Sequence, residues 1–323
     1  MFQLALAPLA ATTLPLAAAA ESPFPDRPIT ITVAAPAGGP SDVITRIVAQ
    51  RLSARLGQPV LVENRPGAFG YVAMQHVARA KPDGYTLVLS SLVYQILNPA
   101  LHKEKLPYNP DRDFAPVALI ARVPYILVAA PSFPANDVKE LVAQVKKYPG
   151  KYNYGLPGGS GNTSQIVMEY FKKTADLDVL PVPFQGDAPS LTAVMGNQVE
   201  MTFTTPLGAT QLIRTGRLKL IGTATATRLP TLPQGKTFAE QGYAQIEAST
   251  WFSFLAPAAT PRPIRERLNA EIDKVLAMPE VRAQIEELGS TAAGGSLVSI
   301  ETFMRSEKAR WTKRVEESGA KVE

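Results

Sequence analysis

Cysteine is absent from all 323 residues of the chain. Its absence excludes disulfide bonds, thiolate nucleophiles and cysteine-ligated metal sites. Histidine is nearly absent too, since the sequence has only His76, predicted in mid-helix, and His102, predicted in a polar loop, where solvated side chains are expected. The sequence also lacks the zinc motif H-E-x-x-H, the Walker A phosphate loop and the nucleophile motif G-x-S-x-G. Catalysis needs a base, a nucleophile or a metal, so an enzyme is the least favoured class.

Basic residues are missing from the start of the chain, where Arg27 is the first. Residues 1–20 are apolar and end in three alanines, which predicts a secretory signal peptide without its usual basic start. A retained apolar anchor is less favoured, because Pro8 and Pro15 interrupt a short run. The net charge of +5 suits an anionic ligand, whereas nucleic acid would require a basic run with interleaved aromatic residues, which the sequence lacks.

Two glycine-rich stretches organise the sequence. The first predicts a strand over 29–35, a turn at Gly38-Gly39-Pro40 and a helix starting at Ser41 and Asp42. The second predicts a strand over 152–154, a turn with four glycines and a helix opening at Asn162-Thr163-Ser164. Such turns present backbone N–H groups at the positive end of a helix dipole, which favours an anion. One turn of this kind usually binds nothing, but two could hold both ends of a small dianion, or one carboxylate between two domains.

Strands and helices alternate along the rest of the chain, which is the rhythm of a doubly wound α/β fold. The apolar stretches 114–130 and 248–256 are interpreted as crossings between two domains. They predict a first domain made of residues 21–122 and 248–323, and a second made of residues 123–247. Three amphipathic helices are expected to end the chain.

Ordered motifs run from Pro25 to the C-terminus. They include Ala37-Gly38-Gly39-Pro40-Ser41-Asp42, Val62-Glu63-Asn64-Arg65-Pro66-Gly67-Ala68, Pro82-Asp83-Gly84-Tyr85-Thr86-Leu87, Asn153-Tyr154-Gly155 and Gly196-Asn197-Gln198-Val199. Together they resemble the Bug-type, TctC-like solute-binding receptors of tripartite tricarboxylate transporters. The resemblance implies a two-domain periplasmic-binding-protein fold, a type II-like Venus flytrap with a mostly parallel sheet in each domain and two crossover segments.

The resemblance also implies a function. It implies a periplasmic receptor, working as a monomer without a cofactor, that captures a small carboxylate and delivers it to membrane permease subunits. A receptor that reports its ligand to a membrane sensor protein uses the same fold and is the alternative.

Carried over by position, the resemblance implies a binding site made of five segments. These are Pro36, Ala37, Gly38, Gly39 and Ser41; Ser90, Ser91 and Tyr94; Gly158, Ser160, Gly161, Asn162, Thr163 and Ser164; Phe184 and Gly186; and Thr204 and Thr205. Asp42 is expected to cap its helix and not to touch an anion, since like charges repel.

Several positions depart from the family pattern. Gln165 or Ile166 stands where a histidine is usual, Thr204 replaces an acidic residue, and Asp187 adds a charge where small residues are usual. These departures leave no obvious carboxylate partner for an amino group. The pocket is therefore expected to favour simple mono- or dicarboxylates, aromatic ones among them, over amino acids.

Overall fold

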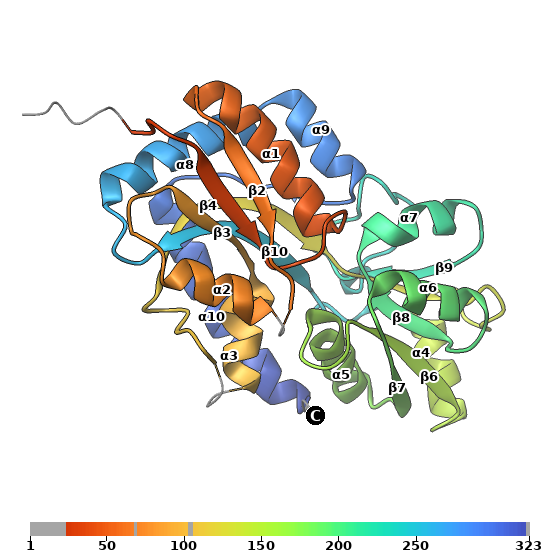
Figure 1. Cartoon of the computed structure of the whole chain (residues 1–323). Coiled ribbons are helices and arrows are strands. Elements are labelled where there is room, and N and C mark those ends of the chain that lie inside the picture. Colours follow the sequence, from red (N-terminus) through yellow and green to blue (C-terminus); the bar gives the residue numbers. More distant parts are fainter. Residues whose placement is uncertain (1–23, 68–69, 103–105, 321–323) are drawn as a thin grey trace, which may run out of the picture.

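Two β-sheets, each covered by helices, form the two lobes of the molecule (Figure 1). The computed structural model describes residues 24–67, 70–102 and 106–320, so the predicted signal peptide, 1–20, lies outside it. The first lobe contains the sheet β11-β4-β10-β3-β1-β2, and the second contains the sheet β7-β6-β8-β5-β9.

The bounds of the strands are as follows. The first sheet contains β1 (Ile29–Val33), β2 (Val60–Asn64), β3 (Thr86–Ser91), β4 (Phe114–Pro124), β10 (Ser249–Pro257) and β11 (Thr291–Ala292). The second sheet contains β5 (Ile126–Ala129), β6 (Tyr152–Pro157), β7 (Val179–Phe184), β8 (Met201–Thr204) and β9 (Lys219–Thr223).

The helices follow the same division. The first lobe carries α1 (Pro40–Leu56), α2 (Tyr71–Ala78), the π-helix η2 (Val93–Leu97), α3 (Asn98–Leu101), α8 (Arg262–Leu276), α9 (Pro279–Glu287) and α10 (Leu297–Ser318). The second lobe carries α4 (Val138–Lys147), α5 (Thr163–Ala175), α6 (Asp187–Met195), α7 (Pro206–Arg214) and the 3₁₀-helix η3 (Ala239–Gln241). In the part of the chain that is described, no helix has the length and apolarity that a membrane span requires.

Most strands of each sheet run in one direction, as expected, but both sheets are mixed because β10 and β11 in the first and β5 in the second run the other way. In the first sheet β1 pairs in parallel with β2 and β3, but β10 runs antiparallel to β3 and β4. In the second, β6 pairs in parallel with β7 and β8, but β5 runs antiparallel to β8 and β9. Two of the reversed strands, β5 and β10, lie directly next to the crossings between the lobes.

The two crossing segments lie side by side and are hydrogen-bonded. The chain leaves the first sheet at Pro124 and enters the second at Ile126. Between them, Tyr125 donates its N–H to the Ala248 carbonyl at 3.1 Å and accepts from the Ala224 N–H at 2.9 Å. The Ala248 N–H in turn donates to the Ala224 carbonyl at 2.8 Å. Because each crossing pairs with the other, we infer that any hinge between the lobes bends at this point.

Apolar periodicity explains why the helices lie where they do. Ile44, Val48 and Leu52 form the buried face of α1 and pack with Ile29 and Ile31 of β1 in the core of the first lobe. The core of the second lobe extends through Ile300 and Trp311 of α10, and α10 also contacts α5. The last helix therefore packs against both lobes.

The region around Asn98 is helical, since it is formed by η2 and α3. Helices α6 and α7 start at Asp187 and Pro206, and both residue types suit the first turn of a helix.

Candidate functional site

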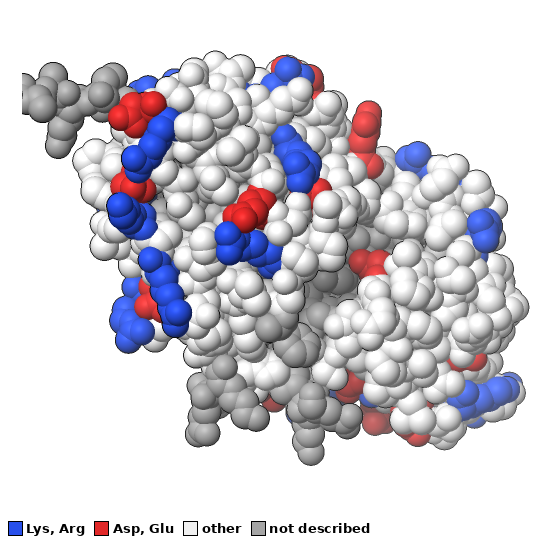
Figure 2. Space-filling model, viewed as in Figure 1, with Lys and Arg blue, Asp and Glu red and all other residues white. Residues whose placement is uncertain are grey.

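Three helix N-termini from both lobes meet at one cavity of about 500 Å³. Pro40 is the first residue of α1, Gly186 and Asp187 begin α6, and Thr205 is the N-cap of α7. All four residues line the cavity, which continues between α6 and α7 over apolar side chains. Figure 2 shows the hollow between the lobes, with walls formed mainly by uncharged residues. Converging helix N-termini favour an anion without requiring a lysine or arginine.

Two close approaches position these helix ends. A Cβ on Gly155 of β6 would lie 2.4 Å from the Ser190 hydroxyl oxygen, so only glycine lets α6 pack this closely on β6. Gly289, which follows α9 in the first lobe, has a φ of +69°, and a Cβ there would lie 2.4 Å from the Cβ of Pro206. The start of α7 therefore rests directly against the first lobe.

The first glycine turn is held by Asp42. Its carboxylate accepts hydrogen bonds from the Gly38 N–H at 2.8 Å, from Asn64 Nδ2 at 2.9 Å and from Arg46 Nε at 3.0 Å. Asp42 is 2% exposed, and burial alone would raise its pKa, but the bonds from Arg46, Gly38 and Asn64 lower it below 3.8. Asp42 reaches back past the N-cap Gly39, so it braces the turn and does not cap the helix. The Gly38 N–H is thus occupied within the protein.

The second glycine turn is held by Asn162 and Gln165. Asn162 is the N-cap of α5: its side-chain oxygen accepts from the Gln165 N–H at 2.9 Å and from the Ser164 hydroxyl at 2.7 Å. Its amide nitrogen donates to the carbonyls of Gly159 and Pro157. The Gln165 side chain accepts from the Gly161 N–H at 2.7 Å. The side chains of Asn162 and Ser164 therefore serve the loop itself, whereas their backbone N–H groups have no acceptor among the described residues.

Some backbone donors at the site remain without an acceptor. The N–H groups of Gly158 and Gly186 both donate to the Phe184 carbonyl, at 2.9 Å each. By contrast, the N–H groups of Ser160, Asn162 and Thr163 donate to no other described residue. They lie in the last part of the turn and at the first position of α5, where N–H groups are left unpaired by helix geometry. The second turn therefore leaves at least these three donors unpaired, although none of its residues lines the cavity between the lobes.

The two serines at the end of β3, and Tyr94 after them, lie away from the cavity. Ser90 and Ser91 are buried, pair with β10, and the Ser90 hydroxyl accepts from Gln95 Nε2 at 3.2 Å. Tyr94 packs against the small cluster around α2 and lies against Gly70, whose φ is +85°. None of the three lines the cavity between the lobes, so their role in binding stays a prediction.

Sequence reasoning missed a polar cluster on the second-lobe wall. Asp187 accepts a hydrogen bond at 2.8 Å from the Thr204 hydroxyl, and Tyr125 lies near Asp187 and Thr163. Burial raises the pKa of Tyr125, as does the neighbouring Asp187. The Thr163 side chain is fully buried, and its oxygen makes no hydrogen bond to a described residue. The signal in the sequence was a tyrosine within the apolar run that forms the crossing.

A second cavity, of about 280 Å³, lies between η2, β4, β10 and α10 of the first lobe. Its lining includes Trp251, Arg305 and Lys308, but none of the predicted binding residues. The described ranges contain no cluster of acidic and histidine side chains that could hold a metal ion. Of the predicted binding residues, only Gly186 and Thr205 line the cavity between the lobes, and those of the two glycine turns do not. Because the second cavity contains none of them, the cavity between the lobes is the candidate site.

Comparison with known proteins places the chain in a family. The sequence model described as "Tripartite tricarboxylate transporter family receptor" matches residues 44–320. This chain belongs to that receptor family. The receptor is similar to the periplasmic binding protein BugD, with 29% identity and a TM-score of 0.80 over 93% of this chain and 100% of BugD. The two-domain periplasmic-binding-protein fold and the Bug-type resemblance are confirmed.

Two further solved structures contain ligands. The receptor is similar to Rpa4515 of R. palustris with adipate, with 30% identity and a TM-score of 0.84 over 93% of this chain and 100% of that one. It is also similar to MatC from Rhodopseudomonas palustris with bound malate, with 32% identity and a TM-score of 0.78 over 90% of this chain and 100% of MatC. The family and these structures are of solute-binding proteins.

Proposed function

We propose that the receptor binds a small carboxylate between its lobes in the periplasm and delivers it to the permease subunits of a tripartite tricarboxylate-type transporter. The observation that carries the proposal is the meeting of three helix N-termini from both lobes at one cavity. The three unpaired N–H groups of the second turn add donors of the kind that a carboxylate accepts. Carboxylates bound to two similar proteins support the same ligand class.

Backbone N–H groups suit this task because they bring no counter-charge. A hydrogen bond to a charged group contributes about 1.5–3 kcal/mol, so a few such bonds, less the costs of closure, give affinities near the micromolar range, about −8 kcal/mol. Within that scheme the predicted residues Pro36, Ala37, Gly39 and Ser41 would face the ligand from the first lobe. Ser160, Asn162 and Thr163 would face it from the second.

Thermal unfolding with a carboxylate panel tests the binding. The protein is first unfolded, washed and refolded to remove any ligand carried from expression. A ligand at a hundredfold excess over its Kd then stabilises the fold by about 2.7 kcal/mol, a shift of several degrees. The expected result is a shift with mono-, di- or tricarboxylates of one shape and none with sodium chloride at equal ionic strength. No shift with any carboxylate would overturn the proposal.

A backbone substitution tests how the carboxylate is held. Thr163 is the first residue of α5, where proline fits the helix, and the extended Asn162 before it tolerates a following proline. Thr163→Pro removes the N–H, whereas Thr163→Val keeps it and removes only the hydroxyl. We expect Thr163→Pro to weaken binding about tenfold or more, and Thr163→Val to weaken it less. Equal effects would show that this N–H does not hold the ligand.

Uptake by cells tests the delivery. Deletion of the gene is expected to abolish uptake of the identified ligand, and the wild-type gene is expected to restore it. Unchanged uptake, together with co-purification of a sensor ectodomain, would instead establish the signalling role.

A further inference from the structure

Asp187 is a carboxylate in a cavity that is otherwise arranged for an anion. It is the first residue of α6 and lines the cavity together with Pro40 of the first lobe and Thr205 of α7. A negative side chain opposes a bound carboxylate by like-charge repulsion, more strongly where water is excluded. Its presence there therefore requires an explanation.

Hydrogen bonding to the backbone does not explain Asp187. Asp42 and Asp137, also at helix starts, both accept backbone N–H groups: Asp42 from Gly38, and Asp137 as the N-cap of α4 from Glu140 at 3.0 Å. Asp187 has no such role, because the N-cap of α6 is Gly186 and the start of α6 has no side-chain cap. The helix dipole favours an acidic residue in this first turn, but only by about 0.3–1 kcal/mol.

No cation compensates Asp187 either. None of the ion pairs among the described residues involves it. The groups that face it are the Thr204 hydroxyl, which donates to Oδ1 at 2.8 Å, and the Tyr125 phenol. Burial raises the pKa of Asp187, while the Thr204 bond opposes the change. A partly buried carboxylate with one hydroxyl donor has acceptor capacity left for a further donor.

Resting on the proposed function, we propose that Asp187 accepts a hydrogen bond from a hydroxyl or ammonium group on the carbon chain of the bound carboxylate. The helix N-termini hold the carboxylate, and Asp187 selects ligands with a donor beside it. A ligand without a donor leaves Asp187 unpaired in a closed cleft, so it binds more weakly. This proposal differs from the sequence-based expectation that simple carboxylates are favoured over amino acids.

Calorimetry with matched ligands tests the proposal. Each set keeps one carbon chain and changes one substituent: succinate, malate and aspartate; glutarate, 2-hydroxyglutarate and glutamate; propionate, lactate and alanine. In the set that fits the cleft, we expect the hydroxyl or ammonium member to bind at least tenfold more tightly than the plain member. A preference for the hydroxyl member identifies a hydroxy acid as the ligand, and a preference for the ammonium member identifies an amino acid.

The variant Asp187→Asn tests whether Asp187 causes the preference. We expect the ratio of affinities within the set to fall at least fivefold, mainly because the plain carboxylate binds more tightly. Asp178→Asn is the matched control, because Asp178 is exposed and lies before β7, at the opposite end of that strand from Asp187. The control should leave the ratio unchanged.

The outcomes separate the two proposals. If no carboxylate binds the wild-type protein, the proposed function fails. If carboxylates bind but the plain member binds as tightly as the others, only the role of Asp187 fails, and this result needs no variant. A ratio that is the same in the wild type and in folded Asp187→Asn also overturns that role.

Discussion

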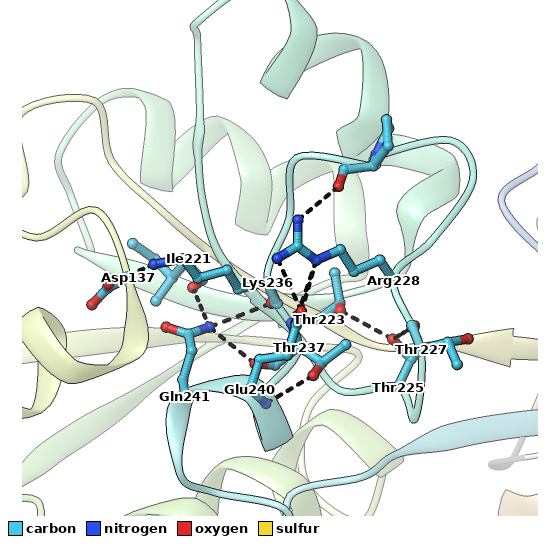
Figure 3. A network of polar contacts seen from close by, with 11 residues as sticks. Asp137, Ile221, Thr223, Thr225, Thr227, Arg228, Lys236, Thr237, Glu240 and Gln241 are labelled. Atoms are coloured by element: carbon cyan, nitrogen blue, oxygen red, sulfur yellow. Dashed lines mark hydrogen bonds and ion pairs between the residues drawn. The ribbon is translucent and has the colours of Figure 1, made fainter.

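Two polar clusters of the second lobe differ in how completely their groups are paired. One surrounds Gln241, on the segment that follows β9 (Figure 3), and the other surrounds Asp187 on the wall of the cleft. Gln241 is 2% exposed; its side chain accepts from the Val138 N–H at 2.7 Å and donates to the carbonyls of Ile221, Lys236 and Thr237 at 3.2–3.3 Å. At the cleft, Thr163 makes no hydrogen bond within the described structure and Asp187 has one hydroxyl donor.

The difference shows how polar groups serve structure and binding. The Gln241 cluster holds residues 224–248 against β9, an edge strand of the sheet. Both the oxygen and the nitrogen of the Gln241 side chain have hydrogen-bond partners within the protein. Pairing of this kind stabilises the fold, because a buried polar group without a partner is costly. The polar groups of the cleft are not fully paired, so they contribute less to the stability of the fold. We infer that these unpaired donors and acceptors bind a ligand.

The largest expected effect is the loss of the Gln241 amide. In Gln241→Leu the Val138 N–H and three carbonyls lose a buried partner, so the free energy of unfolding should fall by about 3 kcal/mol. Denaturant unfolding measures the change, and calorimetry on the folded variant should give an unchanged ligand affinity. The exposed Gln245→Leu is the control, with little expected effect. A loss of affinity in folded Gln241→Leu would show that the two clusters are coupled.

Loss of the Asp42 charge is expected to have the second largest effect. Asp42→Asn should lower the free energy of unfolding by roughly 1–2 kcal/mol at pH 7, because Arg46 loses its charged partner. The folded-state pKa of Asp42 is lowered, so this contribution is present above its ordinary value of 3.8 and is lost as the pH falls through the folded-state pKa. The difference between wild type and variant should therefore shrink below pH 3.8. If the difference in the free energy of unfolding persists below pH 3.8, it arises from packing and not from the charge of Asp42.

A smaller effect is expected at the edge of the Gln241 cluster. The Thr237 hydroxyl accepts from the Glu240 N–H at 3.0 Å, while the Glu240 carboxylate accepts from the Thr237 N–H at 2.7 Å (Figure 3). This reciprocal pair is a capping box, so Thr237→Ala should cost about 1 kcal/mol in thermal unfolding. Thr227→Ala is the control, since only its backbone carbonyl is used, by Thr225. Equal stability of both variants would show that the box contributes nothing.

The smallest expected effect has the opposite sign and lies in the cleft. Asp187→Asn should raise the free energy of unfolding at pH 7, by less than about 1 kcal/mol, since it removes a partly buried charge without a cation. The folded-state pKa of Asp187 is raised, so the penalty is absent below the ordinary value of 3.8 and complete above the folded-state pKa. Unfolding at pH 7 and pH 3 should show the gain only at the higher pH. A loss of stability at pH 7 would give Asp187 a structural role.

Much of the fold could be predicted from local pattern. The buried face of α1, the N-cap Asn162 of α5 and the break between β4 and β5 all follow from periodicity, capping chemistry and proline. Strand direction could not be predicted, because the antiparallel insertion of β5 and β10 depends on how the chain passes between the lobes.

The loops of the candidate site could be predicted from the sequence, but the N–H groups that are free to bind a ligand could not. Both glycine turns were identified, yet the N–H groups of Gly38 and Gly161 are occupied by Asp42 and Gln165. A sequence reports which residues can make a turn, whereas the partner of each N–H depends on side-chain positions. For the same reason Tyr125 was missed as a site residue, and Asp187 was noted only as an added charge.

The sequence by itself determined the elements and the family: strands and helices follow from local propensity and apolar period, and the motifs are contiguous. Only the tertiary structure decided which helix N-termini share a cavity, which donors stay unpaired and that Asp187 faces the cleft. These properties depend on residues such as Pro40 and Asp187, which are far apart in the chain and become neighbours only when the two lobes pack.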